Sequence, residues 1–419
     1  MHIHAALIAA AFVAGCSSSS GTPPADVPPG ADAVTWSYAQ EVVRIDDKIA
    51  FELARVEAQP NSWMTHERLA NAYMERGHLT GSYDDFGRAE ASLRQAFAIA
   101  PEGSGPFFTQ ANLDFTLHRF EAASRSLDAA MALPGRSLEA RASMVSLRGA
   151  LAFAVGDYQV SLQAYEQAAK MGAGYTNDAR IAQYMSRTGD YTAAEALIAR
   201  AELGYHGRAQ RPAAWFHLQR GLFDLDRGRL DEALVHYQRA SAELPGWWLV
   251  DEHIAEIYAL RGKHDVAYVM YTDLVFRTGS PELMGALADS CDALGYPGCA
   301  EHWVMEAGRT YAAQLDRFPE ATYGHALDHV ASHGNPEDAV ALAEKNHALR
   351  ADGDATTALA EAYASAGRLA EASSLLVQVE DTVWRTPDFH DFAAEIFAQV
   401  GDEDRADRHR LGALALRGQ

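Results

Sequence analysis

A pair of small residues, spaced five positions apart, recurs through most of this chain. The clearest copy lies in residues 214–245, where Gly228 follows one apolar helical pattern and Ala233 lies in the next. Glycine can adopt the left-handed conformation that ends a helix, and acids such as Asp231 favour the first turn of the helix that follows. Gly221 and Ala233 are small enough for two helix axes to approach closely. The stretch therefore predicts two short helices joined by a tight turn.

The same plan returns at intervals of 33 to 41 residues. The turn residues at the equivalent place are Gly77, His118, Gly156, Gly189, Gly228, Gly262, Gly295, Gly334, Gly367 and Gly401. Most of them are followed after five positions by a small residue, in Ala123, Ser161, Ala194, Ala233, Ala267, Ala300, Ala339, Ala372 and Ala406. So many units in register predict an all-α chain in which each unit packs on its neighbours.

The pattern resembles the tetratricopeptide repeat (TPR) family, a helix-turn-helix unit with a period of about 34 residues. The residues that carry the resemblance are Gly221, Gly228, Leu230, Ala233, Tyr237, Ala240 and Pro245. It implies a right-handed superhelical solenoid of about ten repeats over residues 61–419. The first repeats depart from the family pattern, because His118 replaces a turn glycine and residues 79–85 are expected to lengthen the first turn.

The first 16 residues form a short apolar run that ends in Val-Ala-Gly-Cys. The run is too short to span a bilayer as a helix and is typical of a signal peptide, here over residues 1–15. The last four residues resemble a bacterial lipobox, which implies that Cys16 is lipidated after cleavage. Ser17 follows, and by the rule for Gram-negative lipoproteins this implies the outer membrane, on its periplasmic or surface face. The alternative is an ordinary signal peptide with an incidental cysteine.

Two segments precede the first repeat. Residues 16–34 have too little apolar content to bury and predict a flexible tether. Residues 35–60 predict a capping helix over the open end of the first repeat, because apolar residues recur there at helical spacing. These residues are Val42, Ile45, Ile49, Leu53 and Val56. The last helix, residues 402–416, is expected to form the other cap.

Charge and motifs exclude several classes of function. The chain has 57 acidic against 35 basic residues, which argues against nucleic acid and anionic lipid surfaces because both require cationic patches. No nucleotide-binding, serine-hydrolase or zinc-protease motif occurs in the sequence. We therefore expect no enzymatic activity and no cofactor.

Two cysteines remain once Cys16 is lipidated. Cys291 and Cys299 lie on either side of the Gly295 turn. In an oxidising compartment an even pair indicates a disulfide, and two buried thiols are the alternative.

Three histidines, His325, His329 and His333, recur in steps of four. This spacing places them on one helix face, where a neighbouring pair could bind a metal, and His347 on the next helix could join them. The alternative is a set of packed or hydrogen-bonded histidines.

The TPR resemblance also implies a concave groove, lined by five fixed positions in the first helix of each repeat. Toward the N-terminus these positions include Phe108, Phe115, Phe153, Trp215, Leu218, Leu222 and Leu225. Toward the C-terminus they include Glu256, Asp289, Asp292, Asp328, Glu361 and Glu395. Aspartate is a poor residue for the middle of a helix, so Asp289, Asp292 and Asp328 indicate a role outside helix formation. They predict a partner segment with an apolar anchor followed by Lys or Arg, and the alternative is a solvated acidic face.

The sequence therefore predicts a lipid-anchored TPR scaffold of the bacterial cell envelope. Such a scaffold would bind protein partners and assist the assembly or retention of an envelope complex. The alternative function is a surface lipoprotein that binds a metal or small ligand through the His325 face.

Overall fold

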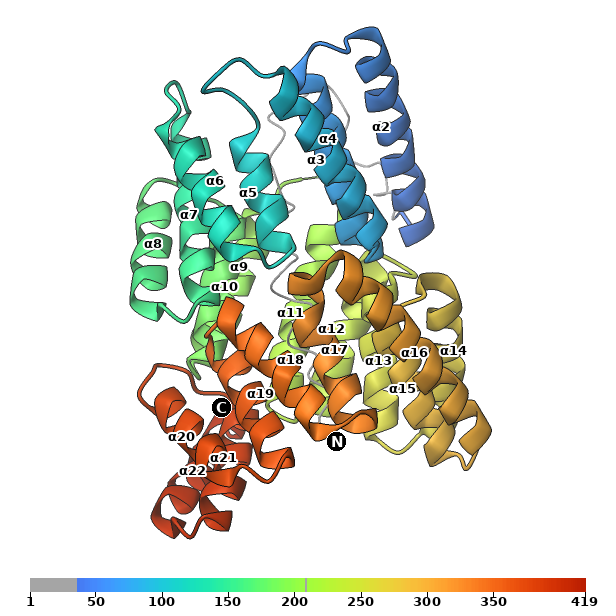
Figure 1. Cartoon of the computed structure of the whole chain (residues 1–419), viewed down its shortest axis with the longest axis vertical. Coiled ribbons are helices and arrows are strands. Elements are labelled where there is room, and N and C mark those ends of the chain that lie inside the picture. Colours follow the sequence, from blue (N-terminus) through green and yellow to red (C-terminus); the bar gives the residue numbers. More distant parts are fainter. Residues whose placement is uncertain (1–35, 208) are drawn as a thin grey trace.

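The computed structural model describes residues 36–207 and 209–419, and these residues form α-helices without any strand. The signal peptide, Cys16 and the tether predicted over residues 1–34 lie outside the described residues. The first described helix is α2 (Tyr38–Ala58), and ten consecutive helical hairpins follow it (Figure 1). The structure thus confirms an all-α solenoid of TPR-like repeats.

The hairpins are numbered one to ten in chain order. The first five are α3 (Trp63–Thr80) with α4 (Tyr83–Ile99), α5 (Phe107–Thr116) with α6 (Phe120–Ala132), α7 (Leu138–Ala154) with α8 (Tyr158–Lys170), α9 (Tyr175–Arg187) with α10 (Tyr191–Gly204), and α11 (Gln210–Asp226) with α12 (Leu230–Glu243). The last five are α13 (Trp248–Leu260) with α14 (His264–Thr278), α15 (Pro281–Ala293) with α16 (Pro297–Arg317), α17 (Pro319–His333) with α18 (Pro336–Leu349), α19 (Gly353–Ser365) with α20 (Leu369–Glu380), and α21 (Pro387–Gln399) with α22 (Glu403–Arg417).

Most turns use the residue that the repeat pattern predicts. Seven of the predicted turn glycines have positive φ, and His118, with φ 57°, takes the same conformation without being glycine. One predicted turn was wrong, and another is in the predicted place but has a different backbone conformation. Gly77 lies inside α3 against the ring of Phe86, and Gly81 ends that helix with φ 73°, so the first turn is short. Gly334 is extended, with φ −105° and ψ −160°, and therefore does not need to be glycine for its backbone conformation.

Within two of the hairpins, an aromatic ring of the second helix packs directly on a glycine of the first helix. A Cβ atom on Gly221 would lie only 2.2 Å from the ring of Tyr237, and one on Gly149 would lie 2.6 Å from Tyr165. Tyr237 and Ala233 are both fully buried. Close packing of this kind leaves no room for an added methyl group, so these glycines set the distance between the paired helices.

Hairpins that are six apart along the chain pack against each other. Arg119 of hairpin two lies 3.7 Å from Glu320 of hairpin eight. The Gly353 N–H of hairpin nine donates to the hydroxyl of Tyr158 in hairpin three, at 2.7 Å. The Arg385 N–H, just before hairpin ten, donates to the carbonyl of Arg187 in hairpin four, at 2.8 Å. The solenoid therefore returns onto itself after about six hairpins, which brings α19–α22 below α7–α10 in Figure 1.

Small residues and stacked rings make this contact close. A Cβ on Gly156 would lie 2.5 Å from the carbonyl oxygen of Ala351. Beside it, the Trp384 ring lies 5.9 Å from the ring of Phe153 and 6.1 Å from that of Tyr158. The contact thus joins two segments that are about 195 residues apart in the chain.

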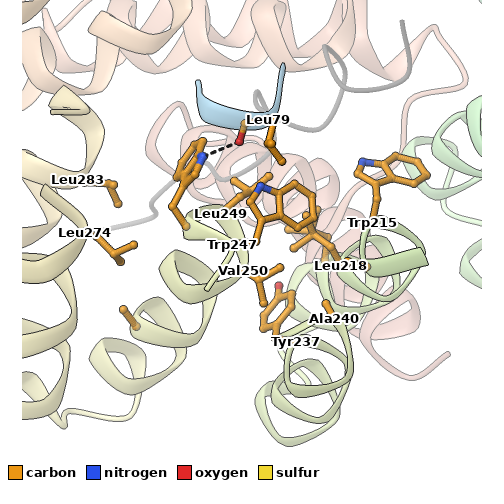
Figure 2. Packing of buried hydrophobic residues seen from close by; sticks show 14 of the residues in the cluster. Leu79, Trp215, Leu218, Tyr237, Ala240, Trp247, Leu249, Val250, Leu274 and Leu283 are labelled. Carbon is orange, nitrogen blue, oxygen red and sulfur yellow. Dashed lines mark hydrogen bonds between the residues drawn. The ribbon is translucent and has the colours of Figure 1, made fainter. Parts of the chain in front are cut away.

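The two ends of the solenoid also dock onto its middle. Helix α2 buries Ile45 and Ile49, while Leu53 stays largely exposed, and the Tyr38 N–H donates to the carbonyl of Pro245 at 2.9 Å. The indole N–H of Trp248 donates to the Leu79 carbonyl at 3.0 Å, the dashed line in Figure 2, which also shows the neighbouring cluster around Trp247 and Leu249.

At the other end, Leu416 of α22 packs beside Gly189, and the side-chain amide of Gln419 donates to the Gly189 carbonyl at 3.0 Å. Helix α22 therefore closes against hairpin four as well as against α21.

Cys291 and Cys299 form a disulfide that joins α15 to α16 across the Gly295 turn, with their Cα atoms 5.8 Å apart. In the chain-entropy model a loop this short stabilises the fold by about 2–3 kcal/mol. No described helix combines the length and the apolar content that a membrane-spanning helix requires.

We expect Tyr158→Phe to lower the free energy of unfolding by about 1–3 kcal/mol, because it leaves the buried Gly353 N–H without its acceptor. Chemical denaturation measures this loss. Tyr296→Phe is the matched control, since Tyr296 is mostly exposed and its removal should change the free energy by less than about 0.5 kcal/mol. Equal stability of the two variants would mean that hairpins three and nine do not pack as described.

Candidate functional site

The first helices of most hairpins converge on a cavity of about 350 Å³ inside the superhelix. Its wall comes from α5, α7, α9, α11, α13, α17, α19 and α21, with a few residues from the second helices. Because hairpins six apart touch, the concave face surrounds this hollow instead of forming an open groove. The cavity is therefore the part of the concave face most able to enclose a ligand.

Four of the seven predicted apolar groove residues line the cavity: Phe115, Phe153, Leu222 and Leu225. The other three do not. Leu218 and Trp215 are buried in the core between hairpins, and Phe108 packs in the cluster around Phe115 and Phe120. Trp384, which precedes α21, completes the apolar wall and was not predicted, because it lies outside the helix positions that the family pattern singles out.

Two of the six predicted acidic groove residues, Glu256 and Asp328, line the cavity. Asp289, Asp292, Glu361 and Glu395 lie on the first helices of their hairpins but not in the cavity wall. Of these, Asp292 and Glu395 are exposed. Helix α15, which carries Asp289 and Asp292, contributes no residue to the wall among those described.

The cavity also holds basic side chains that the groove prediction missed. They are Arg180 and Arg187 of α9, together with Arg350 and Arg417. Arg350 directly follows α18, and Arg417 is the last residue of α22. Arg187 lies 3.4 Å from Asp226, and Arg350 lies 2.6 Å from Asp352. Part of the acidic charge is therefore neutralised inside the protein. Nothing in the repeat pattern signals Arg350 or Arg417, because neither belongs to a first helix.

Asp226 shows how the cavity affects a charged group. Burial raises the pKa of this carboxyl to about 6, although Arg187 acts to lower it, and the charges of Asp388 and Asp354 raise it further. The folded chain therefore holds a proton on Asp226 at a pH where the unfolded chain does not. Stability from this group increases as the pH falls from about 6 to about 4.

We expect Asp226→Asn to remove this pH dependence. Relative to the wild type, the variant should gain about 1–3 kcal/mol of unfolding free energy between pH about 4.5 and pH about 7.5, since asparagine never ionises. Chemical denaturation at both pH values measures the difference. A constant difference between the two proteins would show that Asp226 titrates normally in the folded state.

The structure does not bring the three predicted histidines together around one point. The Nδ1 atom of His325 lies 3.3 Å from Glu282 Oε1, and its ring stacks on His118. His329 lies against Tyr311, with its ring 5.3 Å from that of His333. His347 is elsewhere, with Nε2 3.2 Å from Thr356 Oγ1. His325 is thus engaged by an acid, and only His329 and His333 are neighbours.

A different group on α13 does gather potential metal ligands. One ligand atom from each of Glu252, His253 and Glu256 lies within 4.8 Å of the others, the only such group of three among the described residues. The ring of Tyr237 stacks on His253 at 5.2 Å. Burial raises the pKa of the Tyr237 phenol, and the charges of Glu256 and Glu252 raise it further. Sequence reasoning missed this group because adjacent acid and histidine residues match no familiar metal motif.

Comparison with known proteins gives a likeness of fold. No family model matches the chain, and no curated protein matches it in sequence. A TPR protein from Parabacteroides merdae is 16% identical with a TM-score of 0.35, over 58% of this chain and 93% of that one. Yeast Tom70 is 14% identical with a TM-score of 0.44, over 89% and 90%. PilW, a type IV pilus biogenesis factor, is 16% identical with a TM-score of 0.39, over 52% and 96%.

Proposed function

We propose that this chain is a lipid-anchored TPR scaffold of the bacterial cell envelope that holds a segment of a partner protein inside its superhelix. The observation that supports the proposal is the cavity, which is lined both by aromatic and aliphatic residues of α5, α7 and α11 and by acids of α13 and α17. An apolar anchor on the partner would occupy the first wall. A Lys or Arg next to that anchor would reach Asp328.

The size of the cavity suits this mode of binding. A volume of about 350 Å³ is at the lower end for ligand pockets, so it accepts a few side chains and not a folded domain. The walls are held in place by contacts between hairpins six apart, so binding costs little ordering of the scaffold. We therefore propose a short extended segment of the partner as the bound element.

The partner can be identified by affinity purification of the lipidated protein from its native membrane, followed by mass spectrometry. We expect Asp328→Lys to weaken capture of that partner at least about tenfold, because it places a positive charge where a basic side chain should bind. Asp292→Lys is the matched control, because Asp292 was predicted in the same groove and is exposed, but does not line the cavity. If both variants capture the partner equally well, in low and high salt, the partner binds elsewhere.

We propose that a lipid on Cys16 attaches the protein to the membrane, because Cys16 ends the Val-Ala-Gly-Cys sequence that resembles a lipobox. We expect Cys16→Ala to give an unprocessed or soluble protein, since no other lipidation site is proposed. Membrane fractionation of cells that express the wild type or the Cys16→Ala variant measures how much of each protein is attached to the membrane. Cofractionation of the variant with the outer membrane, as for the wild type, would rule out lipid as the anchor.

A further inference from the structure

We propose that Glu252, His253 and Glu256 form a binding site for one divalent transition-metal ion, of which zinc is the best fit. The three residues lie on consecutive turns of α13, and Glu256 also lines the central cavity. An ion could therefore reach the site from the cavity. The site is separate from the His325, His329 and His333 face.

Two of the three separations between the ligand atoms are close to those that zinc requires, and all three atoms lie within 4.8 Å of one another. His253 Nδ1 lies 3.0 Å from Glu256 Oε2 and 3.3 Å from Glu252 Oε2. A tetrahedral zinc with ligand bonds of about 2.0–2.1 Å separates neighbouring ligand atoms by about 3.3–3.4 Å. The ion could thus bind between these atoms after shifts of the side chains.

The charge of the cluster also calls for a cation. Glu256 and His253 are almost fully buried, and Glu252 is largely buried. In the part of the chain that the structure describes, neither carboxylate forms an ion pair with an Arg or Lys, and His253 is their shared partner. When both carboxylates are ionised, their charge exceeds that of one imidazolium, whereas a divalent ion with neutral His253 balances it.

A second observation comes from Tyr237, which lies on α12. Its side chain is completely buried, and its hydroxyl has no hydrogen-bond partner among the described residues. Its ring stacks on His253, with the two ring centroids 5.2 Å apart. Buried hydroxyls normally have a partner, so an unsatisfied one beside the cluster indicates a missing group, such as a water molecule held by a metal.

The ligand set favours zinc over the common alternatives. One imidazole and two carboxylates suit borderline ions such as zinc, whereas magnesium prefers six oxygen ligands in an octahedron. With three protein ligands, a tetrahedral ion keeps one position for water or for a group that enters through the cavity. The chemistry of the site therefore predicts that zinc binds in preference to magnesium.

The test uses the purified lipid-anchored protein after removal of metals with EDTA and dialysis. We expect calorimetric titration to show one zinc ion bound per chain, and no binding of magnesium at the same concentration. Cobalt(II), used as a spectroscopic probe, should give the visible absorption of a tetrahedral complex. Glu256→Gln and Glu252→Gln should each weaken zinc binding at least tenfold, because each removes a charged ligand while keeping the side-chain shape.

The control variant is His329→Gln with His333→Gln, which should bind zinc as the wild type does. Circular dichroism verifies that each variant is folded, and Glu252→Gln, at the more exposed carboxylate, is the safer of the two ligand changes. Failure of the wild type to bind zinc, or zinc binding that both glutamate variants retain, would overturn the proposal. The titration needs no partner protein, so its outcome is independent of the scaffold function.

Discussion

The contact between hairpins six apart is the constraint on which the rest of this structure depends. A repeat array needs only contacts between neighbours to bury its core. Here the Tyr158 hydroxyl, the Trp384 ring and the backbone at Gly156 add a second set of contacts between hairpins three and nine. A segment near the start of the chain is thereby held against one near its end. These contacts close the superhelix on itself, so that hairpins far apart in the sequence stabilise each other.

This return of the chain changes what the concave face can do. In an open solenoid, the first helices of all repeats would line one continuous groove. In this protein, the helices from α5 to α13 and from α17 to α21 instead surround a hollow, while α15 is left out of its wall. Residues with the same position in their repeats therefore have different surroundings: Asp328 lines the hollow, whereas Asp289, its counterpart in α15, does not. The position of a hairpin along the superhelix decides whether its acids line the hollow.

Two buried charge groups near the cavity differ in how their charge is balanced. Asp226, Asp354 and Asp388 have Arg187 among them, although burial still keeps the pKa of Asp226 raised. Glu252 and Glu256 share only His253 among the described residues. The first group contains a permanent positive charge, that of Arg187, which acts to lower the pKa of Asp226 against the effect of burial. In the group of Glu252, His253 and Glu256, a bound cation would compensate the negative charge, and we therefore propose a metal site there.

The sequence by itself determined the all-α class, the hairpin boundaries and most of the turns. These features depend on local chemistry: a left-handed φ at Gly228 or Gly401, and a small residue where two helix axes meet. The first turn was misplaced at Gly77 because Gly81, four residues later, satisfies the same requirement. Only the tertiary structure decided which groove residues meet, and it brought Arg187, Arg350 and Trp384 into the cavity. The curvature that does this is a sum of small rotations between successive hairpins, and no single repeat contains it.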